Sequence, residues 1–179
     1  MPNNYYFCTR RKQIKRKKMT KYESNVKHIA ASVEDVYAKL CDLENLRPML
    51  EKAHDSDTLK AQMETAGIDA SQLEMLKNVS LTSDRIAIPA PMIGEVSMIV
   101  TDREENKTVK FETEQSPIKA NMWIQVLPSS EVTTAAGGQG TKMRLTLKAD
   151  LNPMVKMMLG SKLEDGIDKF ADMLAIGLA

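Results

Sequence analysis

The chain has 179 residues, of which 42% are hydrophobic, and a formal net charge of +1 at pH 7. This length and apolar content predict a single domain with a hydrophobic core, because domains commonly contain about 100–200 residues. No segment approaches the roughly 18 apolar residues of a membrane-spanning helix, and two Cys and two His are too few for a disulfide framework or a transition-metal site.

The basic residues are concentrated at the N-terminus. Residues 1–18 hold seven of the 25 Lys and Arg residues and no acidic residue, so the remaining chain has 18 basic and 24 acidic residues and a net charge of −6. An acidic body repels nucleic acid and anionic lipid, so only the tail could bind either. The tail has no apolar partner with which to fold, which favours a disordered extension over a nucleic-acid or membrane-surface arm. We expect a disordered tail at 1–20 and one domain at 21–179, in a cytoplasmic protein because no secretory apolar stretch follows the basic residues.

Residues 21–30 alternate in character, which predicts a first strand. One face of this strand would carry Tyr22, Ser24, Val26 and His28. If that face is inward, His28 is a candidate general base, although a surface or structural role is the favoured interpretation.

Two short helices are predicted after this strand. Ser32 is followed three residues later by Asp35, a variant of the capping box that starts a helix. Asp42 can cap a second helix, which Pro48 keeps short or kinked. Residues 57–77 are more polar and broken by a glycine, and we interpret them as a helical insertion.

From residue 79 to residue 149 the apolar residues recur at every second position, which predicts six strands. The apolar positions are Val79 and Leu81; Ile86 and Ile88; Val96, Met98 and Val100; Val109 and Phe111; Met122, Ile124 and Val126; and Met143, Leu145, Leu147 and Ala149. Most connections are too short for crossover helices, so the strands form an antiparallel meander. The loop 135–140 (AAGGQG) lies between two strands and lacks the Lys-Ser/Thr of a phosphate loop, which predicts a hairpin tip.

The C-terminal segment predicts one long amphipathic helix. Asn152 is a capping residue and Pro153 suits the first helical position. An apolar stripe then continues at helical spacing over about 25 residues, through Val155, Leu159, Leu163, Ile167, Phe170 and Leu174. These elements together predict an α+β fold in which a curved antiparallel sheet of about seven strands wraps on the last helix.

This order of elements resembles the helix-grip superfamily, also called SRPBCC or START-like. The superfamily joins START lipid-transfer domains, birch-pollen-allergen-like proteins, and polyketide cyclases and dehydrases. The resemblance covers nearly everything after residue 20 and is carried by the segments KYESNVKHIAASVEDVYAKLCDLENLRPML, RIAIPAPMIGEVSMIVTDREENKTVKFETE, KANMWIQVLP and MRLTLKADLNPMVKMM. It implies a cavity for lipids, sterols or polyketides between the sheet and the last helix, while some members activate chaperone ATPases through protein contacts. The insertion at 57–77 departs from the commonest pattern.

The side chains at the inward positions favour an adaptable apolar pocket. The chain has 13 Met but only one Trp, and Met98, Met122, Met143 and Met158 are predicted to point inward. Methionine repacks easily around different guests, although it also fills gaps in dry cores. The residues that we predict to line a ligand pocket are Ile88, Met98, Phe111, Met122, Ile124, Leu145, Met158, Leu159 and Leu163.

The predicted function is binding, with possible transport, of a small hydrophobic or lipid-like molecule. A cyclase or dehydrase is the first alternative, and it requires an inward polar group such as His28, Asn121 or Gln125. The strand register favours an outward position for Asn121, Trp123 and Gln125, and no catalytic residue, metal or cofactor is predicted. The second alternative is a protein-interaction module that uses residues 57–77. The predicted partner is a small apolar ligand. Nucleic-acid binding is not predicted, except weakly for the basic tail, and no membrane span is predicted. The sequence does not predict the oligomeric state.

Overall fold

The computed structural model describes residues 19–48, 50–51, 57, 61, 64–65, 67, 78–90, 94–116 and 118–179. Residues 1–18 of the predicted tail at 1–20 therefore lie outside the described residues, as does most of the predicted insertion at 57–77. Within that insertion, the described residues 57, 61, 64 and 65 are helical.

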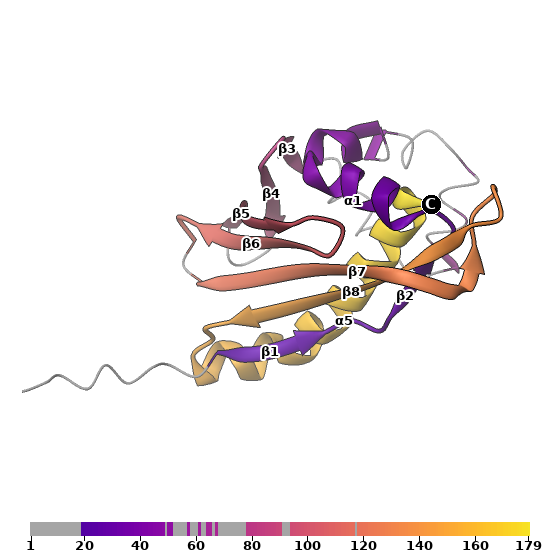
Figure 1. Ribbon diagram of the computed structural model, residues 1–179. Coiled ribbons are helices and arrows are strands. Elements are labelled where there is room, and N and C mark those ends of the chain that lie inside the picture. The colour runs from indigo at the N-terminus through magenta and orange to yellow at the C-terminus, as the bar shows by residue number, and fades with distance from the viewer. Residues whose placement is uncertain are drawn as a thin grey trace, which may run out of the picture.

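One curved antiparallel sheet forms the centre of the protein (Figure 1). Its strands follow the order β1-β8-β7-β6-β5-β4-β3, and β2 also pairs with β8. The strand bounds are β1 Thr20–Glu23, β2 Lys27–Ile29, β3 Ser80–Thr82, β4 Arg85–Ala90, β5 Gly94–Glu104, β6 Thr108–Glu114, β7 Ala120–Thr133 and β8 Gln139–Ala149. Strands β3 to β8 form the predicted meander, and the N-terminal strands pair with its last strand, which confirms the helix-grip fold.

The helices begin where the sequence predicted. Ser32 caps α1 (Val33–Cys41) by accepting a hydrogen bond from the Asp35 N–H at 3.1 Å. Asp42 caps the short helix η1 (Leu43–Leu46). Asn152 caps α5 (Pro153–Leu178), where its Oδ1 accepts from the Val155 N–H at 2.8 Å. Each cap satisfies a backbone donor that would otherwise lack a partner.

The predicted first strand is divided into two, β1 and β2, and this changes which residues face inward. Ser24 makes two hydrogen bonds to Leu145 of β8. Its backbone N–H donates to the Leu145 carbonyl at 3.0 Å, and its Oγ accepts from the Leu145 N–H at 3.0 Å. The chain then leaves the ladder before it pairs again from Lys27. Tyr22 and Ser24 are buried, but Val26 and His28 are exposed. The prediction that these four residues share one face is therefore wrong.

The inner face of the sheet carries a row of apolar side chains that crosses five strands. Pairing in register places Tyr22 of β1 beside Leu147, Leu147 beside Met122, Met122 beside Phe111, and Phe111 beside Val100 of β5. Because residues in register share a face, these side chains form one continuous apolar surface. They belong to the hydrophobic core or pack against it.

Helix α5 runs across β1, β2 and β8 (Figure 1). Its C-terminal half is buried at Ile167, Ala171, Leu174 and Leu178, and the helix end is tied to α1 by a hydrogen bond from Lys39 Nζ to the Leu178 carbonyl at 3.0 Å. Its N-terminal half lies beside β1 and is far less covered. The apolar stripe is thus continuous in sequence, but only its second half is buried.

Candidate functional site

The predicted ligand-lining residues occupy two environments. Met98, Phe111, Met122, Ile124 and Leu145 are buried on the inner face of the sheet. Ile88, Leu159 and Leu163 are half-buried. Met158, which was predicted to point inward, is instead 50% exposed.

Half-buried apolar side chains occur both on the inner face of the sheet and on α5. On the sheet they include Ile88 and Val96, which pair in register, and Val100 two positions beyond Met98. On α5 they include Leu159 and Leu163. An apolar side chain that stays partly uncovered retains area that a guest molecule can bury.

One polar group on the inner face was missed by sequence reasoning. Tyr22 is 8% exposed, and its hydroxyl is buried with no hydrogen-bond partner among the described residues. A Cβ placed on Gly160 of α5 would lie 3.7 Å from this hydroxyl oxygen. A tyrosine on an apolar strand face and a glycine in the facing helix were the available signals, but only the tertiary structure brings the two together.

A charged cluster fixes the β1–β2 connection to α5. Lys27 Nζ lies 3.1 Å from Asp168 Oδ2 and 2.7 Å from Asp172 Oδ1. The Asn25 backbone N–H donates to Asp168 Oδ1 at 2.8 Å. Burial alone would raise the pKa of Asp168, but the hydrogen bonds from Asn25 and Lys27 outweigh burial and hold its pKa below the ordinary value. Burial likewise lowers the pKa of Lys27, but Asp172 and Asp168 outweigh it, so the net pKa is raised.

This cluster predicts a pH-dependent contribution to stability. A carboxylate whose pKa is depressed in the folded protein stabilises it above the unfolded pKa of about 3.9, and this contribution is lost as pH falls through the lower folded pKa. We expect Asp168→Ala to reduce the free energy of unfolding by about 1.5 kcal/mol at pH 7, and by less below pH 4. Urea denaturation at both pH values measures this difference.

Asp165→Ala is the control for that prediction, because Asp165 is exposed on the same helix. It should change the free energy of unfolding by no more than about 0.5 kcal/mol at either pH. If the Asp168→Ala deficit is the same at pH 3 as at pH 7, the ionised carboxylate is not what stabilises this contact.

The polar residues that a cyclase or dehydrase would need lie on the outer face. His28 Nδ1 is 3.1 Å from Ser129 Oγ, and its backbone is in register with the exposed Lys142. Asn121 is in register with the exposed Lys148, and Gln125 is itself exposed. The predicted outward register of β7 is confirmed. None of these three candidate groups therefore reaches the inner side of the sheet.

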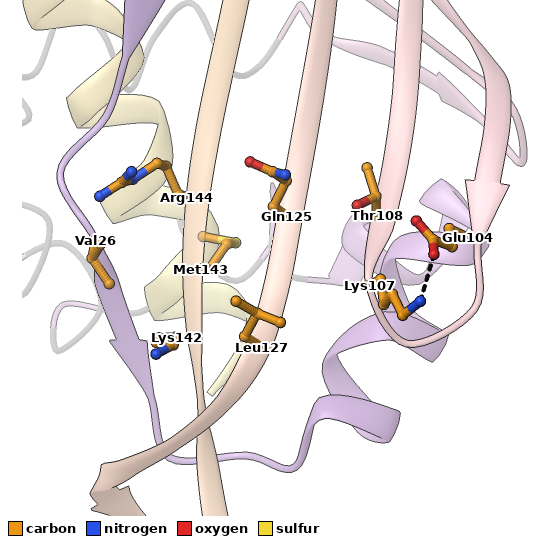
Figure 2. Close-up of a pocket in the computed structure, with 9 residues that line it drawn as sticks. All are labelled: Val26, Glu104, Lys107, Thr108, Gln125, Leu127, Lys142, Met143 and Arg144. Atoms are coloured by element: carbon orange, nitrogen blue, oxygen red, sulfur yellow. Dashed lines mark hydrogen bonds and ion pairs between the residues drawn. The ribbon is translucent and has the colours of Figure 1, made fainter.

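A groove with a volume of about 440 Å³ lies on the outer side of the sheet (Figure 2). Two exposed apolar side chains, Val26 and Leu127, lie there among polar residues. Lys107 Nζ forms an ion pair with Glu104 Oε1 at 2.6 Å. The lining residues are Val26, Glu104, Lys107, Thr108, Gln125, Leu127, Lys142, Met143 and Arg144. None of the predicted ligand-lining residues is among them, so this groove is a separate surface feature.

A second, broader hollow of about 780 Å³ lies where β2 meets the end of α5. It is lined by Val26, Lys27, His28, Ala30, Ala61, Thr65, Asp172, Ala175, Ile176 and Ala179. Lys27 and Asp172, two charged residues that line this hollow, form an ion pair with each other. This hollow also contains none of the predicted lining residues.

Neither a metal centre nor a membrane-spanning helix is found in the described ranges. Among these residues, no three His, Cys, Asp or Glu side chains are grouped to hold a metal ion. No helix in the described part of the chain is both long enough and apolar enough to span a membrane.

No protein-family model and no curated protein matches the sequence. Solved structures do match it in fold. A protein from Thermus thermophilus is 18% identical, with 89% of this chain and 94% of that chain covered and a TM-score of 0.52. Truncated norcoclaurine synthase from Thalictrum flavum is 10% identical, with 88% and 93% covered and a TM-score of 0.53. A protein from Thermobifida fusca is 14% identical, with 86% and 90% covered and a TM-score of 0.51. At these identities the similarity establishes the helix-grip fold and nothing finer.

Proposed function

We propose that the protein binds a small, largely apolar molecule between the inner face of the sheet and the N-terminal half of α5. The observation that carries this proposal is the incomplete burial of inward apolar side chains on both walls, Ile88, Val96 and Val100 on the sheet and Leu159 and Leu163 on the helix. A chain that needed only a packed core would gain stability by covering this area.

The fold neighbours support the same proposal. A point mutant of norcoclaurine synthase from Thalictrum flavum, which shares this fold, forms a complex with a transition-state analogue. A protein of this fold can therefore bind a small organic molecule. We do not transfer the reaction of that enzyme, because it depends on residues that a shared fold does not supply.

The predicted lining residues have distinct roles in this proposal. Phe111, Met122 and Leu145 are buried and form the floor of the site. Leu159 and Leu163 are half-buried and contact the guest from the helix side. Burial of about 300 Å² of apolar ligand surface contributes about 7 kcal/mol before the entropic cost of association, and methionine side chains such as Met98 allow the wall to adapt.

The proposal predicts that filling the inner space blocks uptake of an apolar compound. We expect N-phenyl-1-naphthylamine, a fluorescent apolar probe, to bind the wild-type protein with enhanced emission. Leu159→Trp should weaken its binding about tenfold or more, because the indole occupies space that the probe would use. Fluorescence titration measures the dissociation constant, and thermal unfolding checks that the variant remains folded.

Leu127→Trp is the matched control. Leu127 is 51% exposed and lines the outer groove, so the same substitution there should leave probe binding unchanged. If Leu127→Trp weakens binding and Leu159→Trp does not, the probe occupies the outer groove and the proposed location is wrong. If the wild-type protein gives no enhancement, apolar ligand binding itself is contradicted.

A further inference from the structure

The Tyr22 hydroxyl is an exception among the inner polar groups. The Ser24 Oγ accepts from the Leu145 N–H at 3.0 Å, the Thr113 Oγ1 accepts from the Ala120 N–H at 2.9 Å, and the Thr141 Oγ1 donates to the Ala31 carbonyl at 2.8 Å. The Tyr22 hydroxyl has no partner in the described part of the protein, although it is buried. An unsatisfied buried hydroxyl is destabilising, and native proteins rarely retain one without a reason.

The position of this hydroxyl is at the edge of the proposed ligand space. Tyr22 begins the apolar row that continues through the half-buried Leu147 to Met122. Gly160 faces it from α5 without a side chain, and the half-buried Leu159 precedes that glycine. The hydroxyl therefore lies near Gly160 of α5, and the ring beneath it is beside the half-buried Leu147.

A buried water molecule would need further polar partners around Tyr22. Buried waters make about three hydrogen bonds, so they need several polar groups around them. The described residues supply no second unsatisfied buried side-chain group with which a water could bridge. A ligand that carries its own polar atom on an apolar body satisfies the hydroxyl without a further protein partner.

We infer that Tyr22 is the polar anchor of the binding site, and that its hydroxyl donates a hydrogen bond to a neutral carbonyl or hydroxyl oxygen on an otherwise apolar ligand. This inference rests on the proposed function and specifies the ligand class. A neutral oxygen is favoured over a carboxylate because the strand neighbour Leu147 and the facing Gly160 are uncharged. Lys156 is the charged residue nearest to Gly160, with its Cγ 3.9 Å from a Cβ placed there, and it is exposed. An ionised group buried with one tyrosine as its only partner would cost more than the hydrogen bond returns.

The test compares two compounds of nearly equal shape, 2-acetylnaphthalene and 2-ethylnaphthalene, which differ by a carbonyl oxygen. Both are measured by displacement of N-phenyl-1-naphthylamine from wild-type protein and from Tyr22→Phe. We expect Tyr22→Phe to weaken binding of the acetyl compound about fivefold and to leave binding of the ethyl compound within twofold of wild type.

Tyr37→Phe is the control, because Tyr37 is a buried tyrosine on α1 that is not part of the proposed site. It should not distinguish the two compounds. If Tyr22→Phe binds both compounds as well as wild type does, the anchor is wrong while the proposed function stands. If wild-type protein binds neither compound nor the fluorescent probe, the proposed function fails and the anchor fails with it.

The stability of the unliganded protein gives an independent readout. If the hydroxyl is unsatisfied, Tyr22→Phe removes a destabilising group, so its thermal midpoint should equal or exceed that of wild type. A lower midpoint would mean that the hydroxyl already has a partner in the free protein, and it would overturn the inference.

Discussion

Gly140→Ala is expected to destabilise the protein by about 3 kcal/mol, because the added methyl group would overlap atoms of two neighbouring strands. A Cβ at this position would lie 2.6 Å from the Ile29 carbonyl oxygen and 2.6 Å from Val132 Cγ2, with the Val132 carbonyl oxygen at 3.0 Å. Two of these atoms belong to the backbone and cannot rotate away. Gly140 stands where β2, β8 and β7 meet, so relief of the overlap would require the strands to separate.

Gly166→Ala is the control for the same substitution. Gly166 is exposed in α5, and a Cβ there would meet nothing within 4 Å. Alanine should stabilise the helix by about 0.5–1 kcal/mol, because it restricts the unfolded chain more than glycine does. Urea denaturation of the two variants should therefore give changes of opposite sign, and equal destabilisation would contradict the steric explanation.

Phe111→Ala is expected to reduce the free energy of unfolding by about 4 kcal/mol. Phe111 is 1% exposed and lies near the middle of the apolar row on the inner face, between Met122 and Val100. Removal of the ring loses its burial and leaves a void that strands on both sides cannot close. The loss is large compared with the total stability of a typical domain, about 5–15 kcal/mol.

Phe111→Leu keeps this prediction measurable if the alanine variant does not fold. It should cost about 1.5 kcal/mol, less than half of the alanine effect. Met157→Ala is the exposed comparison, since Met157 is 83% exposed and its truncation should cost no more than about 0.5 kcal/mol. Urea denaturation measures all three variants, and a similar loss at positions 111 and 157 would show that burial on the inner face does not control stability here.

Several local features could be predicted because their causes are local. The caps at Ser32 and Asn152 use hydrogen bonds to residues three positions later, and a sequence window contains both partners. The alternation in β8 predicts its two faces because successive side chains on a strand point in opposite directions. The same period placed Asn121 and Gln125 of β7 on the outer face.

The division of the first strand could not be predicted in this way. Ser24 and Asn25 are held by Leu145 and Asp168, which lie 121 and 143 positions away. No local pattern encodes those bonds, and they turn Val26 and His28 away from the face that simple alternation assigned. The lining of the ligand site stays a prediction for a related reason, because apolar spacing identifies a stripe without telling how much of it the fold will cover.

The sequence by itself determined the order of the elements, the starts of the helices and the apolar face of the strands, since these depend on residues close together in the chain. The tertiary structure decided which part of the α5 stripe is buried and where the Tyr22 hydroxyl lies relative to Gly160. It left Met154 and Met157 71% and 83% exposed, although they belong to a methionine-rich segment. Burial is a property of surfaces brought together from distant segments, so it is fixed only when the helix is placed against the sheet.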